Sequence, residues 1–91
     1  MRAKRVDENQ QEIIGTLKEA GYSVHDTHDL GGGFPDIVVG CDKGNVLAEI
    51  KMPGKGLNEK ETKWFMSWKG PKVVIYTKGE AVKQIEKVLE E

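Results

Sequence analysis

Apolar residues in the first part of the chain recur at the spacing of a helix. The pattern predicts a helix from about Lys4 to Ala20, ended by Gly21. Acidic residues fall on the opposite side of this helix. Its inner face is expected to hold Val6, Gln10, Ile13, Ile14 and Leu17.

Three shorter segments follow that have the composition of strands. Residues 22–28 are polar, which is typical of a strand at a sheet edge. Residues 36–39 and 46–51 are apolar, and the turn sequence Asp42-Lys43-Gly44-Asn45 lies between them, which predicts an antiparallel hairpin. Three consecutive glycines at residues 31–33 precede the hairpin and predict a loop.

The second half of the chain predicts a helix, a strand and a last helix. Asn58 with Glu61 is a capping pair, so a helix is expected over residues 58–69. Residues 73–76 are apolar and predict a strand in the centre of the sheet. Thr77 and Glu80 cap the last helix, whose apolar face is expected to hold Val82, Ile85, Val88 and Leu89.

The predicted order is helix, three strands, helix, strand, helix. A hairpin followed by a helical crossover to another strand implies a mixed sheet with helices on both faces, so the fold class is α/β (α+β). The 91 residues are expected to form one domain, residues 1–91, with one modest core.

Charge is distributed unevenly along the chain. The formal net charge of -1 gives no overall attraction to nucleic acid. Residues 43–72 nevertheless hold seven lysines against three glutamates, whereas residues 1–42 hold eight acidic side chains against four basic ones. A local basic surface beside acidic groups is what a phosphate backbone would need.

The composition also bears on the compartment. No apolar run approaches the length that spans a bilayer, and the first residues lack the apolar segment of a signal peptide. Cys41 is the only cysteine, so no intramolecular disulfide can form. We therefore expect a cytoplasmic protein in a reducing compartment, with no membrane partner.

Two acids and a lysine stand at the ends of the predicted hairpin strands. Asp36 opens the first strand, and Glu49 lies near the end of the second. Lys51 shares a strand face with Glu49 because successive side chains alternate. Two carboxylates on paired strands make an oxygen-lined site for a hard divalent cation, and a lysine beside them can orient a water. This set suits hydrolysis of a phosphodiester.

These residues carry a family resemblance. Pro35-Asp36 followed by Glu49-Ile50-Lys51 resembles the signature of the PD-(D/E)XK nuclease superfamily, and the predicted element order resembles its restriction-endonuclease-like core. The segments 31–39 and 47–51 are similar to the VRR-NUC family in its short stand-alone form from phages and bacteria. The resemblance extends over nearly the whole chain.

The resemblance implies a metal-dependent DNA endonuclease. Asp36, Glu49 and the backbone carbonyl of Ile50 would hold Mg²⁺ or Mn²⁺, which would lower the pKa of a bound water. Lys51 would position that water and stabilise the negative charge of the transition state. The cell would be a bacterium or a phage-infected host.

Many members of the superfamily also place a glutamate on the inner face of the first helix. Here Gln10 lies about 20° from Leu17 at 100° per residue, whereas Glu12 lies about 140° away. Gln10 is therefore the candidate for this fourth catalytic position. Glu12 or Glu8 would replace it if the helix starts or tilts differently.

The remaining expectations concern DNA and partners. Gly32, Gly33, Lys55 and Lys60 are the candidate DNA-contacting residues. The resemblance implies structure-selective cutting of branched DNA by a homodimer, similar to a Holliday-junction resolvase. Trp64, Phe65 and Trp68 form a helical stripe that serves either the core or a homodimer contact. The alternative function is a non-catalytic nucleic-acid-binding or accessory module with a nuclease-like fold.

Overall fold

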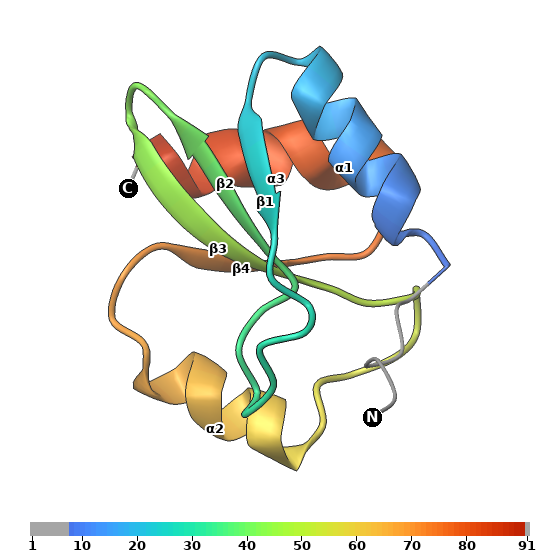
Figure 1. The fold of residues 1–91 in the computed structure, drawn as a ribbon, viewed down its shortest axis with the longest axis vertical. Coiled ribbons are helices and arrows are strands. Elements are labelled where there is room, and N and C mark those ends of the chain that lie inside the picture. The colour runs from blue at the N-terminus through green and yellow to red at the C-terminus, as the bar shows by residue number, and fades with distance from the viewer. Residues whose placement is uncertain (1–7, 91) are drawn as a thin grey trace.

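The computed structural model describes residues 8–90 and confirms the predicted order of elements (Figure 1). The fold is α+β, with one mixed sheet of four strands and three helices, and it is consistent with a restriction-endonuclease-like core. The elements are α1 (Gln10–Glu19), β1 (Ser23–Asp26), β2 (Ile37–Cys41), β3 (Gly44–Ile50), α2 (Glu59–Ser67), β4 (Lys72–Ile75) and α3 (Lys78–Glu90).

The strands lie side by side in the order β1-β2-β3-β4. The pairs β1–β2 and β2–β3 are antiparallel, and β3–β4 is parallel. The expectation that the strand around residues 73–76 is central was wrong, because β4 forms an edge. The crossover through α2 places β4 outside β3, and the described chain after β4 is helical. The strand is apolar because α3 packs against it, not because strands flank it on both sides.

One face of the sheet carries the core. Helices α1 and α3 cover this face together (Figure 1). Alternate residues of β3 point into it, as the period of two requires. The buried cluster consists of Ile13, Ile14, Leu17, Ile37, Val39, Val46, Ala48, Ile50, Val73, Ile75, Ala81 and Ile85.

The other face of the sheet is turned toward α2. Leu47 and Glu49 point to this side because they alternate with the core residues of β3. Their cross-strand partners Val38 and Val74 share the face. In Figure 1, α2 lies below the sheet, on the side away from α1 and α3. Helices therefore lie on both sides of the sheet, and a carboxylate is held between the sheet and α2.

The ends of the elements differ from expectation by a few residues. Glu8 and Asn9 form a turn, so α1 begins at Gln10 and not at Lys4, while residues 4–7 and Val6 lie outside the described part. The side chain of Asn9 explains this start, because its Nδ2 donates to the carbonyls of Lys51 (3.2 Å) and Tyr76 (2.7 Å). The start of the first helix is thereby attached to the ends of β3 and β4.

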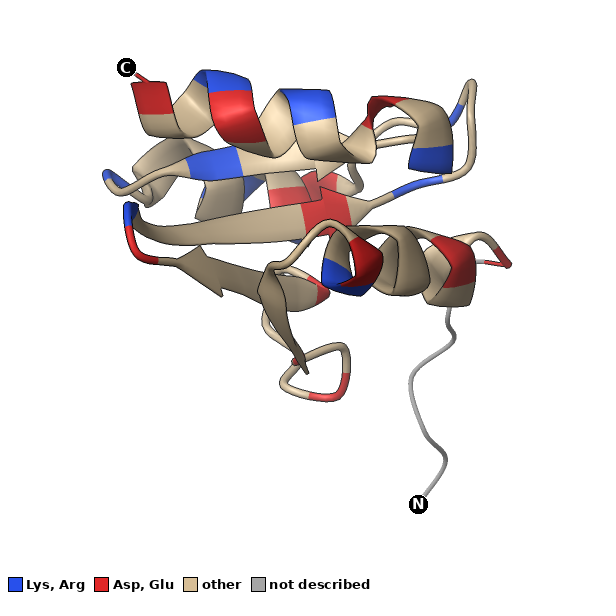
Figure 2. Cartoon of the chain, turned by 90° about the horizontal axis from the view of Figure 1, so that it is seen from above, with Lys and Arg blue, Asp and Glu red and all other residues tan. Residues whose placement is uncertain are grey.

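Charged residues mark which surfaces face solvent. Along α3, lysines alternate with glutamates on the outer side (Figure 2). Figure 2 also shows acidic residues within the sheet layer, where Glu49 is the buried example. Within residues 8–90, no helix has both the length and the apolar character that crossing a bilayer requires.

Candidate functional site

The site begins with the pairing of β2 and β3. Ile37 pairs with Ala48, so the next step along the same antiparallel register sets Asp36 opposite Glu49. Asp36 is 8% exposed and Glu49 is 3% exposed. The backbone N–H of Ile50 donates to Oδ2 of Asp36 over 2.8 Å, which fixes the orientation of that carboxylate. The structure thus brings the two predicted acids together at one end of the hairpin.

Lys51 joins this pair from the end of β3. Its Nζ lies 3.9 Å from Oε2 of Glu49 and 2.8 Å from Oε1 of Glu61. The three residues of the predicted motif therefore converge on one place. The ammonium group is held between two elements, since Glu49 belongs to the sheet and Glu61 to α2.

Glu61 is a member of the site that the sequence reasoning missed. It was expected only to cap α2, and this role is confirmed: its Oε1 accepts from the N–H of Asn58 (2.9 Å), and Oδ1 of Asn58 accepts from the N–H of Glu61 (2.8 Å). The same carboxylate oxygen binds Lys51. A capping glutamate is fixed in position by its helix, so its place shortly after Glu-x-Lys was the available signal.

The carboxylates influence one another strongly. Burial raises the pKa of Glu49 to about 9, and the negative charges of Asp36 and Glu61 add to this effect. Burial also acts to raise the pKa of Glu61, but hydrogen bonds from Lys51 and from the backbone of Asn58 hold it below the ordinary value. At neutral pH Glu49 is therefore protonated and in hydrogen-bonding contact with its two acidic neighbours.

The donor set fits a hard divalent cation in part. Within residues 8–90, no three side chains of His, Cys, Asp or Glu are arranged to hold a metal ion. The predicted ligands are fewer, namely two carboxylates and the carbonyl of Ile50. Mg²⁺ commonly uses one or two carboxylates and fills its other positions with water and substrate phosphate. The raised pKa of Glu49 is also compatible with a cation at this place. A divalent cation could replace the proton of Glu49 and neutralise the buried carboxylates.

Gln10 lies on the inner face of α1, as predicted, but its side chain points to a different partner. It is 1% exposed, and its Nε2 donates to Oδ2 of Asp26 over 3.4 Å. Its Oε1 is buried and has no hydrogen-bond partner among the described residues. The other two candidates, Glu8 and Glu12, are exposed. Gln10 is therefore the only one of the three that is buried against the sheet.

Asp26 links Gln10 to the loop after β1. Its Oδ1 accepts from the backbone N–H of His28 (3.0 Å) and lies 2.6 Å from the Nδ1 of the same histidine. Burial acts to raise the pKa of Asp26, but the bonds from His28 hold it below its ordinary value. The hydrogen bond to Asp26 in turn raises the pKa of His28. His28 thus belongs to a local ion pair.

The glycine loop packs against α2. Gly31, Gly32 and Gly33 all have positive φ angles. A Cβ at Gly33 would lie 2.5 Å from the carbonyl oxygen of Lys60, whereas Gly31 and Gly32 face open space. The backbone of α2 therefore comes close to Gly33, one of the residues expected to contact DNA. A hollow of about 210 Å³ lies there, lined by Gly31, Gly32, Gly33, Asn58, Lys60 and Glu61.

The other two predicted DNA-contacting residues are both exposed. Lys60 is exposed on the first turn of α2, next to the loop glycines. Lys55 is exposed in the segment between β3 and α2. Both lysines are therefore accessible to a polyanion that approaches the acidic site.

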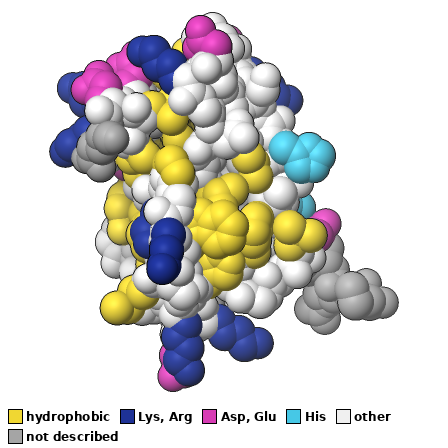
Figure 3. Space-filling model, turned by 90° about the vertical axis from the view of Figure 1, so that its left-hand side faces the viewer, with side chains coloured by type: hydrophobic (Ala, Val, Ile, Leu, Met, Phe, Trp, Pro, Cys, Tyr) yellow, Lys and Arg dark blue, Asp and Glu magenta, His cyan; other side chains and the backbone are white. Residues whose placement is uncertain are grey.

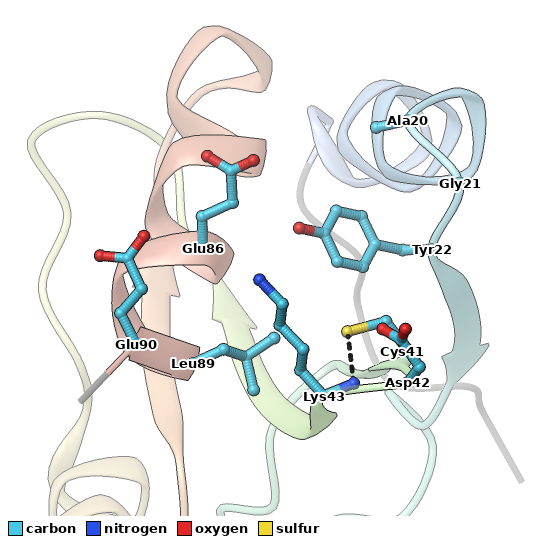
Figure 4. A pocket seen from close by; sticks show the side chains of 9 residues that line it. All are labelled: Ala20, Gly21, Tyr22, Cys41, Asp42, Lys43, Glu86, Leu89 and Glu90. Carbon is cyan, nitrogen blue, oxygen red and sulfur yellow. Dashed lines mark hydrogen bonds between the residues drawn. The ribbon is translucent and has the colours of Figure 1, made fainter.

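A second hollow lies at the opposite end of the hairpin. It has a volume of about 320 Å³, and Figure 4 shows its lining side chains, with the ammonium of Lys43 directed between Tyr22 and Glu86. The backbone N–H of Lys43 donates to Sγ of Cys41 over 3.4 Å. Burial raises the pKa of Tyr22, and the nearby Glu86 and Cys41 raise it further by a smaller amount. This hollow shares no residue with the acidic site.

Comparisons with known proteins do not extend this description. The chain matches no protein-family model, and it matches no curated protein. The geometry of Asp36, Glu49, Lys51 and Glu61 is therefore what a functional proposal has to build on.

Proposed function

We propose that the protein is a Mg²⁺- or Mn²⁺-dependent DNA endonuclease of the PD-(D/E)XK type that hydrolyses phosphodiester bonds. The observation that carries the proposal is the convergence of two buried carboxylates, Asp36 and Glu49, with the ammonium of Lys51. A buried acidic pair costs free energy unless a cation or a proton compensates it. Such a cost is typical of a site that is used in chemistry.

Each residue has a role in this proposal. Asp36 and Glu49, with the carbonyl of Ile50, hold the cation, which when bound supplies Lewis-acid activation of water and phosphate. Lys51 orients the attacking water and stabilises negative charge on the phosphate. Glu61 is a positioning residue, because it holds the Lys51 ammonium at 2.8 Å. Gln10 orients Asp26 through a hydrogen bond of 3.4 Å.

The proposed substrate is DNA with a branched or distorted structure, and the proposed assembly is a homodimer. The VRR-NUC resemblance supports both. The exposed Lys60, which lines a hollow together with Glu61, and the exposed Lys55 support a polyanionic substrate. The proposed setting is the cytoplasm of a bacterium or a phage-infected cell.

Cleavage assays test this function. Purified protein is incubated with four-way junctions and with linear duplex, in Mg²⁺, in Mn²⁺ and in EDTA. We expect metal-dependent cutting that favours the junction, and a loss of about 100-fold or more in Asp36→Asn and Glu49→Gln. Glu19→Gln removes an exposed acid of α1 that is no candidate for the site and is the matched control.

Two outcomes would contradict the proposal. Absence of cutting in every divalent ion, with binding that is unchanged by EDTA, would favour the non-catalytic nucleic-acid-binding module. Cutting that survives in both acid variants would place the chemistry elsewhere. Equal cutting of junction and duplex would remove only the structure-selective part.

A further inference from the structure

Helix α2 carries an aromatic stack next to the acidic site. The rings of Trp64 and Trp68 lie parallel, with centroids 5.0 Å apart and an angle of 13° between their planes. Phe34, from the loop before β2, meets Trp64 edge-on at 5.2 Å. Phe34 thus supports one end of the stack, and Trp68 forms its other end.

Trp68 is unusually accessible for a stacked tryptophan. It is 41% exposed although Trp64 covers one face of its ring. The stack therefore leaves part of the Trp68 indole open to solvent. Figure 3 shows hydrophobic side chains gathered in the middle of this side of the molecule, with lysine or arginine side chains among and below them. The contact with Phe34 accounts for the position of Trp64, but packing does not account for an indole of Trp68 that is left partly open to solvent.

A groove connects the stack to the acidic site. It has a volume of about 390 Å³ and is lined by Gly32, Lys60, Lys63, Trp64 and Ser67. Gly32 and Lys60 also line the hollow that contains Glu61. Since Glu61 binds Lys51, a ligand lying along the groove would extend from the indoles to the proposed catalytic lysine.

The spacing of side chains on α2 places cations beside the aromatic rings. Lys60 and Trp64 are four residues apart on one line of the helix, and Trp68 follows at its C-cap. Lys63 with Ser67 forms the neighbouring line. Lys60 and Lys63 are exposed. Glu59 lies 4.0 Å from Lys63, and Glu61 is already bound to Lys51. The groove therefore offers cationic and aromatic groups together, which is the combination that binds single strands of nucleic acid.

We propose that this surface binds a single-stranded segment of nucleic acid, with the backbone held in the groove by Lys60 and Lys63 and an unpaired base stacked on the exposed indole of Trp68, which adjoins the groove through its contact with Trp64. In an intact duplex, neighbouring bases cover both faces of each base, so none is available to the indole. The inference deepens the proposed function and rests on it: the preferred substrate would carry unpaired nucleotides beside the cleaved bond.

The chain contains two tryptophans, and both belong to this stack. Intrinsic tryptophan fluorescence therefore reports on the groove directly. The protein is titrated in EDTA with a thymidine oligonucleotide, and separately with the blunt duplex that this strand forms with its complement. We expect the single strand to quench the fluorescence and to bind at least about tenfold more tightly than the duplex.

Substitutions separate stacking from general attraction. Trp68→Ala should weaken single-strand binding by about tenfold or more, measured by anisotropy of a labelled oligonucleotide, whereas Trp68→Phe should keep most of it. Met66→Ala is the matched control, because Met66 is an apolar side chain of the same helix that is 78% exposed and lies off the stripe. Circular dichroism establishes that each variant is folded.

The results that would overturn the inference are specific. Equal affinity for single strand and duplex would do so, as would unchanged binding in Trp68→Ala. If Trp68→Ala instead converts a dimer to a monomer in sedimentation and leaves DNA binding unchanged, the surface is a contact between copies of the chain. Because binding is measured without metal, single-strand binding can be observed even if the protein cleaves no DNA. If the protein cleaves DNA but Trp68→Ala binds the single strand as tightly as the wild type, the single-strand inference fails and the proposed nuclease function stands.

Discussion

The ammonium of Lys51 lies 2.8 Å from a carboxylate oxygen of Glu61, so the lysine of the sheet is positioned by the helix that follows it. We expect Glu61→Gln to keep the helix cap, because an amide oxygen can still accept from the N–H of Asn58. It should lose the charge that holds Lys51. The expected result is a fall of about tenfold in kcat with a smaller change in KM.

The matched control for this variant is Asn58→Ala, which removes the other half of the capping box and leaves the ion pair. It should lower the free energy of unfolding by about 1 kcal/mol and change kcat little. A Glu61→Gln enzyme with unaltered kcat would show that Lys51 needs no such positioning.

The raised pKa of Glu49 makes stability depend on pH. The folded protein holds this proton up to about pH 9, whereas an unfolded glutamate releases it near its ordinary value of 4.5. The folded state therefore binds more protons between these limits, and the free energy of unfolding should fall as the pH rises through this window. Without metal, we expect the wild type to lose about 5 kcal/mol more than Glu49→Gln between pH 5 and pH 9.

Urea unfolding in EDTA at both pH values measures this difference. Comparison with Glu49→Gln cancels the contribution of His28, whose pKa is also raised. Parallel pH profiles for the two proteins would mean that Glu49 is ionised in the folded state.

Binding of a divalent cation should release the proton of Glu49. The apparent affinity for Mn²⁺ should therefore rise with pH up to about 9, by as much as about tenfold per unit. Calorimetric titrations in two buffers of different ionisation enthalpy measure the protons released. We expect close to one proton at pH 7 in the wild type and none in Glu49→Gln. A titration without proton release in the wild type would contradict this exchange.

Gly33 should be the least replaceable glycine of its loop. Its φ is +86°, and an added Cβ would meet the carbonyl of Lys60 at 2.5 Å. Gly32 has a similar φ of +65° but open space around it. We expect Gly33→Ala to lower the free energy of unfolding by about 3 kcal/mol and Gly32→Ala by about 1 kcal/mol.

Thermal or urea unfolding measures the free energy of unfolding of both alanine variants. Both variants share the backbone strain of a positive φ, so the difference between them reports the clash with Lys60 alone. Gly33→Ala should also reduce cleavage more than Gly32→Ala, since it displaces the helix that bears Glu61. Equal stabilities would mean that α2 can move away at no cost.

The sequence predicts those contacts of the site that depend on residues close together along the chain. A short turn fixes the register of β2 and β3, and this register places Asp36 opposite Glu49. The capping pair Asn58 and Glu61 was likewise visible, because a cap depends on residues three apart.

The remainder depends on how distant elements meet. The contact of Glu61 with Lys51 requires α2 to approach the loop at Gly33, and no local pattern encodes that approach. Gln10 was placed on the inner face by periodicity, but its partner Asp26 comes from β1. The apolar sequence of β4 suggested a central strand because burial by a helix and burial by neighbouring strands favour the same residues.

The attachment of Asn9 to the carbonyls of Lys51 and Tyr76 has a practical consequence for labelling. The start of α1 therefore lies directly beside the lysine proposed to act on DNA, and a fluorophore attached at that point would sit next to the proposed site. Helix α3 ends next to the hollow lined by Glu86 and Glu90, at the other end of the hairpin. Immobilisation or dye coupling at the end of α3 should therefore leave the surroundings of Lys51 unobstructed.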